Sequence, residues 1–467
     1  MPIPSPDAPL PNSTAARDIA YHLHGFTDLA RHREAGPLVI CRGEGVRVFD
    51  EAGNGYIEGM AGLWYASLGF SERRLAEAAH RQMERLPAYH TFSGRVPDVV
   101  AELAERLVGL APAPLARAMF CNSGSEANDT AIKLIWQVNN LLGRPAKKKI
   151  VARTGAYHGV TIAAGSLSGL PFVHGGFDLP VPGFLHTTRP HHYREGTPGE
   201  SEEAFASRCA EDLEKLILAE GPDTVAAFFA EPVIGAGGVV VPPATYFEKI
   251  QAVLKRHDVL LVADEVICGF GRTGNLWGCD TYGITPDILT TAKALSAGCA
   301  PIAAVLVSQA IYDVLLGSSE RYGMLGHGFT YAGHPLSAAV ALETLKIYEE
   351  RDILGHVRAV APHFQKGLRA FAGSPLVGEV RGVGLVGAVQ LVKDKPARAF
   401  FDPKQRVGLY LIERAQAYGL ITRSMADAIA FSPPLIISEA EIDEMLDAFG
   451  RAMQDTERWV AGGMPAV

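Results

Sequence analysis

The sequence lacks any run of eighteen or more apolar residues, so no membrane-spanning helix is expected. It also lacks an excess of basic residues: 43 lysines and arginines stand against 51 aspartates and glutamates, which leaves a net charge of −8. This balance argues against nucleic acid or an anionic membrane as the main partner. It leaves a small-molecule site open, because such a site sets its own local field.

Cysteine is scarce, and its pattern matches no common metal or disulfide motif. No two cysteines form a C-x-x-C pair, and no Cys/His cluster has the spacing of zinc ligands, so no metal is expected. In so long a chain they indicate reduced, mostly buried thiols, as is typical of the cytoplasm. The stretch Met1–Asn12 lacks the basic start and apolar run of a signal peptide. The six cysteines are Cys41, Cys121, Cys209, Cys268, Cys279 and Cys299.

The middle of the chain alternates apolar runs typical of strands with helical patterns, which predicts an α/β domain around a mostly parallel sheet. The polar, Gly- and Pro-bearing stretch His186–Glu203 is interpreted as a surface loop. The predicted strands are Ala118–Cys121, Lys149–Arg153, Ala226–Ala230, Val259–Ala263, Ile288–Thr291 and Ala303–Val307. The predicted helices include Glu126–Leu142, Phe205–Leu218 and Ala244–Arg256.

The two ends of the chain differ from this pattern. Short strands are predicted near Gly45–Ile57, a long helix from Pro335, strand-like structure over Gly378–Val392 and a helix near Val407–Tyr418. We therefore predict a large central domain and a smaller α+β domain built from both termini. The predicted boundaries are a loose arm at 1–14, the small domain at 15–69 and 335–467, and the large domain at 70–334.

The segment Ser123-Gly124-Ser125-Glu126-Ala127-Asn128 follows a short predicted strand and opens a predicted helix. A helix start presents unpaired N–H groups and the positive end of the dipole, which suits a phosphate. Gly124 would let the backbone approach closely, and the hydroxyls of Ser123 and Ser125 would add donors. The segment is also consistent with a plain N-cap that needs no ligand.

Two carboxylates end the apolar strand Val262-Ala263-Asp264-Glu265-Val266. Because side chains alternate along a strand, Asp264 and Val266 share a face and Glu265 points away. Asp264 would lie where open α/β sheets bind ligands. Its role would be that of a metal ligand, a general base, a partner for a protonated ring nitrogen, or a helix N-cap.

Lys293 follows another apolar strand and precedes a turn of small residues ending at Gly298. A lysine here is either a surface charge or a desolvated amine with a lowered pKa. The small-residue turn favours an amine that forms an imine.

Tyr157 and Glu231 lie at the ends of two further predicted strands. The tyrosine ring would stack on a flat ligand or pack in the core. Together these segments supply a phosphate cradle, an aromatic platform, an acid and a lysine at one edge of one sheet. Pyridoxal 5′-phosphate (PLP) needs this set, because it carries a phosphate, a flat ring, a protonated ring nitrogen and an aldehyde.

With these motifs in place, the sequence resembles the class III aminotransferases of PLP fold-type I, and within them the omega-transaminases, or amine:pyruvate transaminases. The resemblance runs in order from about His24 to Pro434. It implies an α/β fold with a large domain around a mostly parallel seven-stranded sheet and a smaller α+β domain. The matching segments are Ser123–Asn128, Tyr157–Gly159, Glu231-Pro232, Asp264–Gly274 and Lys293 with its turn.

The resemblance also implies residue roles. Lys293 would bind the cofactor covalently and later carry a proton, and Asp264 would pair with the pyridine nitrogen. Phe329-Thr330 resembles the segment that reaches the phosphate from a neighbouring subunit, which implies a homodimer or a dimer of dimers. The cofactor-binding residues would be Ser123, Gly124, Ser125, Tyr157, His158, Glu231, Asp264, Val266, Lys293, Phe329 and Thr330.

On the substrate side, Trp64 lies in a segment that resembles the pocket of amine:pyruvate transaminases. Phe26 and Phe92 lie where that subfamily places further aromatics, although all three would also suit a core. Tyr157 would border the same pocket. Arg423 matches the arginine that binds the substrate carboxylate and swings aside for amines without one; its two-pronged bond suits pyruvate.

These matches predict a PLP-dependent, (S)-selective omega-transaminase that moves an amino group from a primary amine to pyruvate by a ping-pong mechanism. β-Alanine, diamines and arylalkylamines are all open as donors. The alternatives are a decarboxylase or 2,1-aminomutase of the same fold, or a non-catalytic PLP-fold binding protein. The predicted location is the cytoplasm, with neither nucleic acid nor membrane as a partner.

Overall fold

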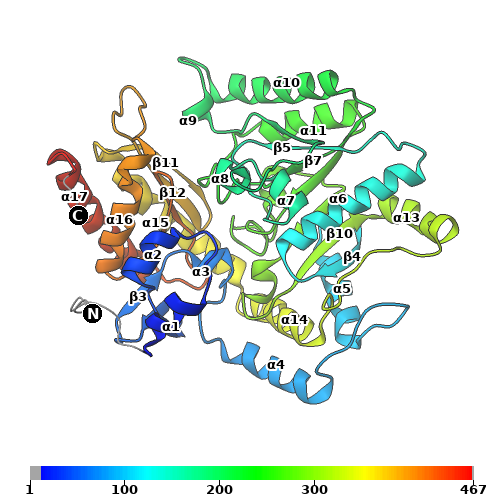
Figure 1. Cartoon of the computed structure of the whole chain (residues 1–467), viewed down its shortest axis with the longest axis horizontal. Helices are drawn as coiled ribbons and strands as arrows, with labels where there is room; N and C mark the ends of the chain where they lie inside the picture. Colours follow the sequence, from blue (N-terminus) through cyan, green and yellow to red (C-terminus); the bar gives the residue numbers. More distant parts are fainter. Residues whose placement is uncertain (1–11, 465–467) are drawn as a thin grey trace.

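A seven-stranded sheet forms the centre of the computed structural model, which describes residues 12–464 (Figure 1). Strand β10 runs antiparallel to both its neighbours, β4 and β9, and the other neighbouring pairs are parallel. The mostly parallel seven-stranded sheet predicted from the sequence is confirmed. In spatial order the strands are β4 (Leu115–Cys121), β10 (Ala303–Ser308), β9 (Ile288–Thr291), β8 (Leu260–Asp264), β7 (Val225–Ala230), β5 (Lys149–Arg153) and β6 (Phe184–Thr187).

Helices cover both faces of this sheet, so the inner strands are buried at almost every position, and β7 is apolar throughout. In β10, Ala303 and Val305 join the apolar cluster beneath helix α6 (Gly124–Leu141), whereas Ala304 and Leu306 face the larger core. The period of two along the strand therefore separates two cores. The helices that contribute to the larger core include α5 (Asp98–Leu110), α10 (Glu202–Glu220), α11 (Tyr246–Arg256) and α14 (Pro335–Glu350).

Two four-stranded sheets are built from the ends of the chain, and Figure 1 shows strands of both to the left of the central sheet. In the first, β3 from the N-terminal part pairs in parallel with β13 from the C-terminal part. This pairing agrees with a small domain made from both termini, while the domain boundaries stay predictions. The first sheet is β1 (Ile40–Glu44), β2 (Arg47–Asp50), β3 (Gly55–Glu58) and β13 (Leu420–Ile421). The second is β11 (Val377–Val383), β12 (Val386–Leu391), β15 (Ala428–Phe431) and β14 (Arg423–Met425).

The stretch predicted as a loop over His186–Glu203 is partly regular. Strand β6 extends to Thr187, and a single turn of helix, α9 (His192–Glu195), follows. Strand β6 is paired in parallel with β5, so its backbone hydrogen bonds outweigh the polar composition around it. The loop prediction was therefore wrong at both ends and in the middle, because α10 begins at Glu202.

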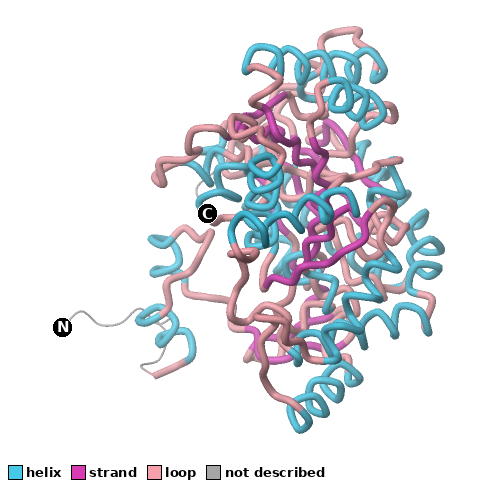
Figure 2. The backbone as a smooth tube through the Cα atoms, turned by 90° about the vertical axis from the view of Figure 1, so that its right-hand side faces the viewer, coloured by secondary structure: helices cyan, strands magenta, loops and turns pink. Residues whose placement is uncertain are grey.

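The first described residues form two short helices, α1 (Thr14–Tyr21) and α2 (Leu29–Ala35). Neither helix has a buried residue, and Figure 2 shows the helical segment beside the N mark standing away from the main body. The loose arm predicted at 1–14 falls mostly on residues 1–11, outside the described residues. Ordered structure begins before Ala15, because the Ser13 hydroxyl caps α1 by accepting from the Ala16 N–H at 3.1 Å.

All six cysteines are free, and four of them are buried, which confirms the expectation of reduced, mostly buried thiols. Within residues 12–464, no helix combines the length and apolar character needed to cross a bilayer.

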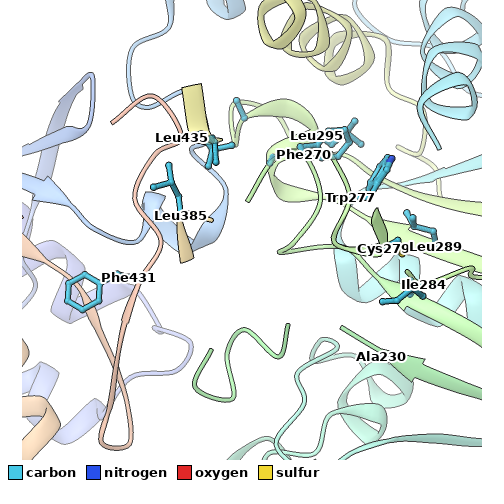
Figure 3. Close-up of a cluster of buried hydrophobic side chains, with 14 of the residues drawn as sticks. Ala230, Phe270, Trp277, Cys279, Ile284, Leu289, Leu295, Leu385, Phe431 and Leu435 are labelled. Atoms are coloured by element: carbon cyan, nitrogen blue, oxygen red, sulfur yellow. The ribbon is translucent and has the colours of Figure 1, made fainter. Parts of the chain in front are cut away.

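The main core continues from the central sheet toward the terminal sheets. Figure 3 shows part of it, with Trp277 on the side of the central sheet and Leu435 toward the C-terminal part of the chain. Arg272 lies at this junction and is 2% exposed. Its Nη1 donates to the Leu385 carbonyl at 3.0 Å and to the Pro433 carbonyl at 2.6 Å. Burial lowers the pKa of Arg272 to about 10. The cation thus satisfies two buried carbonyls that belong to the C-terminal part of the chain.

We expect Arg272→Met to destabilise the protein by about 2 kcal/mol, because two buried carbonyls would lose their donor while relief of the buried charge returns part of that cost. The melting temperature and the urea midpoint should both fall. Arg73→Ala is the matched control, because that side chain is 89% exposed and forms a surface ion pair with Glu77. Unchanged unfolding of Arg272→Met would contradict this structural role.

Candidate active site

One cavity of about 310 Å³ lies where the parallel strands of the central sheet end. Strand ends of an open α/β sheet meet at one edge, which is where such sheets bind ligands. The structure thereby brings together nine residues predicted from separate segments of the sequence. They are Ser123, Gly124, Ser125, Tyr157, His158, Glu231, Asp264, Val266 and Lys293.

The N-terminus of α6 forms one end of the cavity. The Ser123 hydroxyl caps the helix by accepting from the Glu126 N–H at 3.2 Å. A Cβ on Gly124 would lie 3.1 Å from Cγ1 of Val266, so any larger residue would require this side chain to shift by a few tenths of an ångström. The Ser125 hydroxyl accepts from the Val160 N–H at 3.2 Å and ties the helix start to the loop after β5. These backbone N–H groups and the helix dipole suit an anion such as a phosphate.

Asp264 is held by three donors and is 3% exposed. Its Oδ2 accepts from Asn128 Nδ2 at 2.8 Å and lies 2.7 Å from Nδ1 of His158. Its Oδ1 accepts from the Val266 N–H at 3.1 Å. These contacts fix the position of the carboxylate at the end of β8.

Sequence reasoning assigned no separate role to Asn128, which holds several of the groups around Asp264. Asn128 also donates to the His158 carbonyl at 2.7 Å, and its own carbonyl accepts from Thr290 Oγ1 at 2.9 Å. Asn128 thus links α6, the loop after β5 and β9 around one carboxylate. The available signal was its place on the first turns of the helix that opens the phosphate cradle.

Glu231 and Glu265 are buried but do not play equivalent parts. Glu231 accepts from the Tyr157 N–H at 3.1 Å and from the Gly235 N–H at 2.8 Å, so it positions the backbone of Tyr157. Glu265 points away from the cavity, as the alternation along β8 predicts. It accepts from the N–H groups of Gly278 at 3.0 Å and Cys279 at 2.6 Å, and burial raises its pKa to about 7.

Lys293 begins a single 3-10 turn, η1 (Lys293–Ser296), with a φ of 49°. A left-handed backbone at a non-glycine residue stores strain that the surroundings must offset. Burial lowers the pKa of the amine, while the nearby charges of Asp264 and Glu231 oppose that shift. Among residues 12–464 the amine has no ion-pair partner, which leaves it available to a ligand in the cavity.

The donor set fits PLP, the cofactor implied by the resemblance. The start of α6 suits its phosphate, Val266 and Tyr157 border the space for its ring, and the Asp264 carboxylate suits a protonated ring nitrogen. Lys293 supplies the amine that an aldehyde requires.

A second cavity of about 400 Å³ adjoins the first, because both are lined by Tyr157 and Lys293. Phe26, Trp64 and Arg423 line it as predicted. The rings of Phe26 and Tyr157 meet edge to face with centroids 6.3 Å apart.

The segment that carries Trp64 is strained and anchored. Ala61, Gly62 and Trp64 all have positive φ within α3 (Ala61–Trp64). The buried Glu58 carboxylate accepts from the Gly62 N–H, and burial raises the pKa of Glu58 to about 7. Glu58 is therefore a positioning residue for the indole that sequence reasoning did not identify.

Arg423 lies on β14 and is partly buried, which lowers its pKa. It forms no ion pair among residues 12–464; burial is the main cause of its lowered pKa, and Tyr157 opposes that shift. An arginine without a carboxylate in a largely aromatic and apolar pocket is suited to bind one from a substrate.

Three predicted residues lie outside both cavities. Phe92 and Thr330 are exposed, and Phe329 is partly buried. Phe92 packs on the segment that carries the other two, since a Cβ on Gly328 would lie 2.5 Å from its ring. Phe92 therefore lies beside the segment of Phe329 and Thr330 and not beside Trp64. A role for Phe329 and Thr330 in a neighbouring subunit stays a prediction.

Comparison with known proteins agrees with this geometry. The family model for aminotransferase class-III matches residues 29–453. The chain is 50% identical over 462 residues to gamma aminobutyrate transaminase 3, chloroplastic, of Solanum lycopersicum, covering 98% of this chain and 89% of that protein. It is 51% identical over 425 residues to vanillin aminotransferase of Capsicum annuum, covering 91% and 93%. The solved omega transaminase from Pseudomonas jessenii in complex with PMP superposes with a TM-score of 0.95 at 52% identity, covering 97% of this chain and 100% of that one.

We expect Lys293→Ala to abolish multiple turnover and the visible absorbance of lysine-bound cofactor, because no other amine lines the cavity at this position. Absorbance spectra and steady-state kinetics check both effects. Lys215→Ala is the control, since that side chain is 69% exposed. Turnover of Lys293→Ala at the wild-type rate would refute the assignment.

We expect Asp264→Asn to retain the cofactor but to lose more than about tenfold in kcat, because a neutral amide lowers the pKa of a facing ring nitrogen. Glu265→Gln should change kcat little, since Glu265 points away and a glutamine can still accept one backbone N–H. Equal losses in the two variants would show that the effect is one of folding.

Proposed function

The chain belongs to the class-III aminotransferases, which use PLP, and we propose that it is an (S)-selective omega-transaminase that transfers an amino group from a primary amine to pyruvate. The proposal rests on Arg423, which forms no ion pair among residues 12–464 and lines a pocket together with Trp64 and Phe26. β-Alanine, diamines and arylalkylamines are the proposed donors, and the reaction would be ping-pong. Rates with each enantiomer of 1-phenylethylamine test the selectivity.

Bound PLP supplies an electron sink for the carbon that carries the amine, and it stores the amino group between the two half-reactions. The protein supplies the rest. Lys293 holds the cofactor and, with its lowered pKa, moves a proton at the substrate carbon. Asp264, fixed by Asn128 and His158, keeps the negative charge at one place in the cavity.

Arg423 would bind the pyruvate carboxylate with two parallel hydrogen bonds. For a donor that lacks a carboxylate, a fixed guanidinium would disfavour an apolar substituent, so its side chain must turn away. Trp64 and Phe26 would then form the remaining walls of the pocket.

A second candidate donor is 4-aminobutyrate. Several relatives bear the name of gamma-aminobutyrate transaminases, and Arg194 lines the same cavity without an ion-pair partner among residues 12–464. Its guanidinium lies over the Phe400 ring at 4.3 Å. Arg194 would bind the distal carboxylate of this donor in one half-reaction. Arg423 would bind the carboxylate of pyruvate in the other.

A decarboxylase, a 2,1-aminomutase and a non-catalytic protein are the alternatives. Transfer of amine nitrogen to pyruvate, measured as alanine formation, separates all three from the proposal. A homodimer or dimer of dimers and a cytoplasmic location also stay predictions; the plant relatives are named chloroplastic or mitochondrial.

We expect Arg423→Ala to damage the half-reaction with alanine or pyruvate far more than the half-reaction with 1-phenylethylamine. Loss of the two-pronged contact should cost about 2–4 kcal/mol, or about 30- to 1000-fold in kcat/KM for the acid. The amine half should change by about tenfold or less, because its transition state does not use the guanidinium. Single-turnover spectroscopy follows each half separately.

Arg194→Ala is the matched control in the same pocket. It should spare alanine and 1-phenylethylamine and weaken only 4-aminobutyrate. Equal losses in both halves for Arg423→Ala would make Arg423 a structural residue, and no loss in either would assign the carboxylate to another cation.

A further inference from the structure

Three histidines lie around one aspartate in the segment 14–35, called the N-terminal arm from here on. It consists of α1, the linker 22–28 and α2. Asp18 lies in the last turn of α1, His22 and His24 follow that helix, and His32 lies on α2. Nδ1 of His22 lies 2.9 Å from Asp18 Oδ1, and Nε2 of His24 lies 2.8 Å from Oδ2. The ligand atoms of Asp18, His22 and His24 all lie within 4.8 Å of one another.

His32 adds a fourth group with an unusual environment. Its Nε2 lies 3.0 Å from Asp18 Oδ2, yet this buried nitrogen has no aligned hydrogen-bond partner. The rings of His22 and His24 are 4.1 Å apart, and those of His24 and His32 are 4.3 Å apart. The Nε2 atom of His32 thus lies beside the carboxylate without a hydrogen bond to it, and a turn of the ring would make this nitrogen available to a cation bound by Asp18.

We propose that Asp18, His22, His24 and His32 bind one divalent transition-metal ion, with Zn²⁺ as the best match. Imidazole nitrogens and a carboxylate oxygen are ligands that zinc prefers, and four of them complete a tetrahedron. Zinc holds such atoms at about 2.0–2.1 Å, which sets neighbouring ligand atoms about 3.3 Å apart. Among these four residues, Asp18, His22 and His24 already place their ligand atoms within 4.8 Å of one another, so their separations from Asp18 need to widen by only a few tenths of an ångström, whereas the His32 ring must also turn toward the ion.

The ion would enter from solvent, because the His22 side chain is 63% exposed. Bound there, it would join α1, the linker and α2, two helices that bury no residue of their own. The linker carries Phe26, which lines the proposed substrate cavity only two residues beyond His24. The metal would therefore order the segment that forms one wall of the pocket.

The metal site does not depend on the proposed function, so its test uses binding rather than activity. Tag-free, PLP-loaded enzyme is stripped with a chelator, dialysed and titrated with ZnCl₂ by calorimetry, and metal content is measured by mass spectrometry. We expect one zinc per chain in the wild type. His24→Ala and His32→Ala should each weaken binding by about a hundredfold or more.

His80→Ala is the matched control, because that histidine is exposed and its ion pair, with Glu84 at 3.5 Å, lies far from Asp18 in the sequence. It should bind zinc like the wild type. Circular dichroism and retained PLP absorbance establish that each variant is folded. Stoichiometric zinc binding that is equal in wild type, His24→Ala and His32→Ala would overturn the site, as would no zinc binding by the wild type.

Limited proteolysis tests the ordering of the arm. Zinc should slow tryptic cleavage at Arg17 and Arg33 of the wild type and leave cleavage in His24→Ala unchanged, because a ligand that binds the folded arm stabilises it. Zinc binding without this protection would overturn the ordering role.

Discussion

The active site depends on the way one buried carboxylate is held. Asp264 is fixed by Asn128 from α6, by His158 from the loop after β5 and by the N–H of Val266. Thr290 of β9 in turn fixes Asn128. A buried carboxylate is costly unless its oxygens are hydrogen-bonded, so four segments must be in register to hold this one. The parallel sheet provides that register, because it delivers each segment to the same edge.

This constraint explains why so much of the site could be predicted from the sequence. Polar residues lie at or just after the ends of β5, β7, β8 and β9, and parallel strands bring their ends together. Nine predicted residues consequently line one cavity. Strands buried on both faces are continuous apolar runs, which made them visible in the sequence. Strand β6 was missed because polar residues around His186 hid a short paired segment.

What could not be predicted depends on contacts between distant segments. Asn128 hydrogen-bonds groups far from itself in the sequence, and its place on the first turns of α6 was the one signal of its role. Glu58 accepts from the Gly62 N–H across a strained turn, for which the local pattern gives no signal. The histidines at 22, 24 and 32 do not have the spacing of a zinc motif, so only the packing of α1 against the linker and α2 brings them to Asp18. Phe92 was assigned to the pocket by its place in the sequence, yet its ring packs on Gly328, outside both cavities.

The substrate pocket combines one rigid wall with one adaptable group. Trp64 is 3% exposed, and Glu58 anchors its strained segment through the Gly62 N–H, so the indole has little freedom to move. Arg423 has the opposite character: its partial burial lowers its pKa, and no carboxylate within residues 12–464 retains it. A guanidinium held in this way gains hydration when it turns toward solvent and gains an ion pair when a carboxylate enters. Under the proposed function, an enzyme that alternates between an acid and an apolar amine needs one group whose two positions have similar free energies. The rigid Trp64 keeps the shape of the pocket constant. Arg423 changes the charge that the pocket presents, because its cation faces the substrate in one position and solvent in the other.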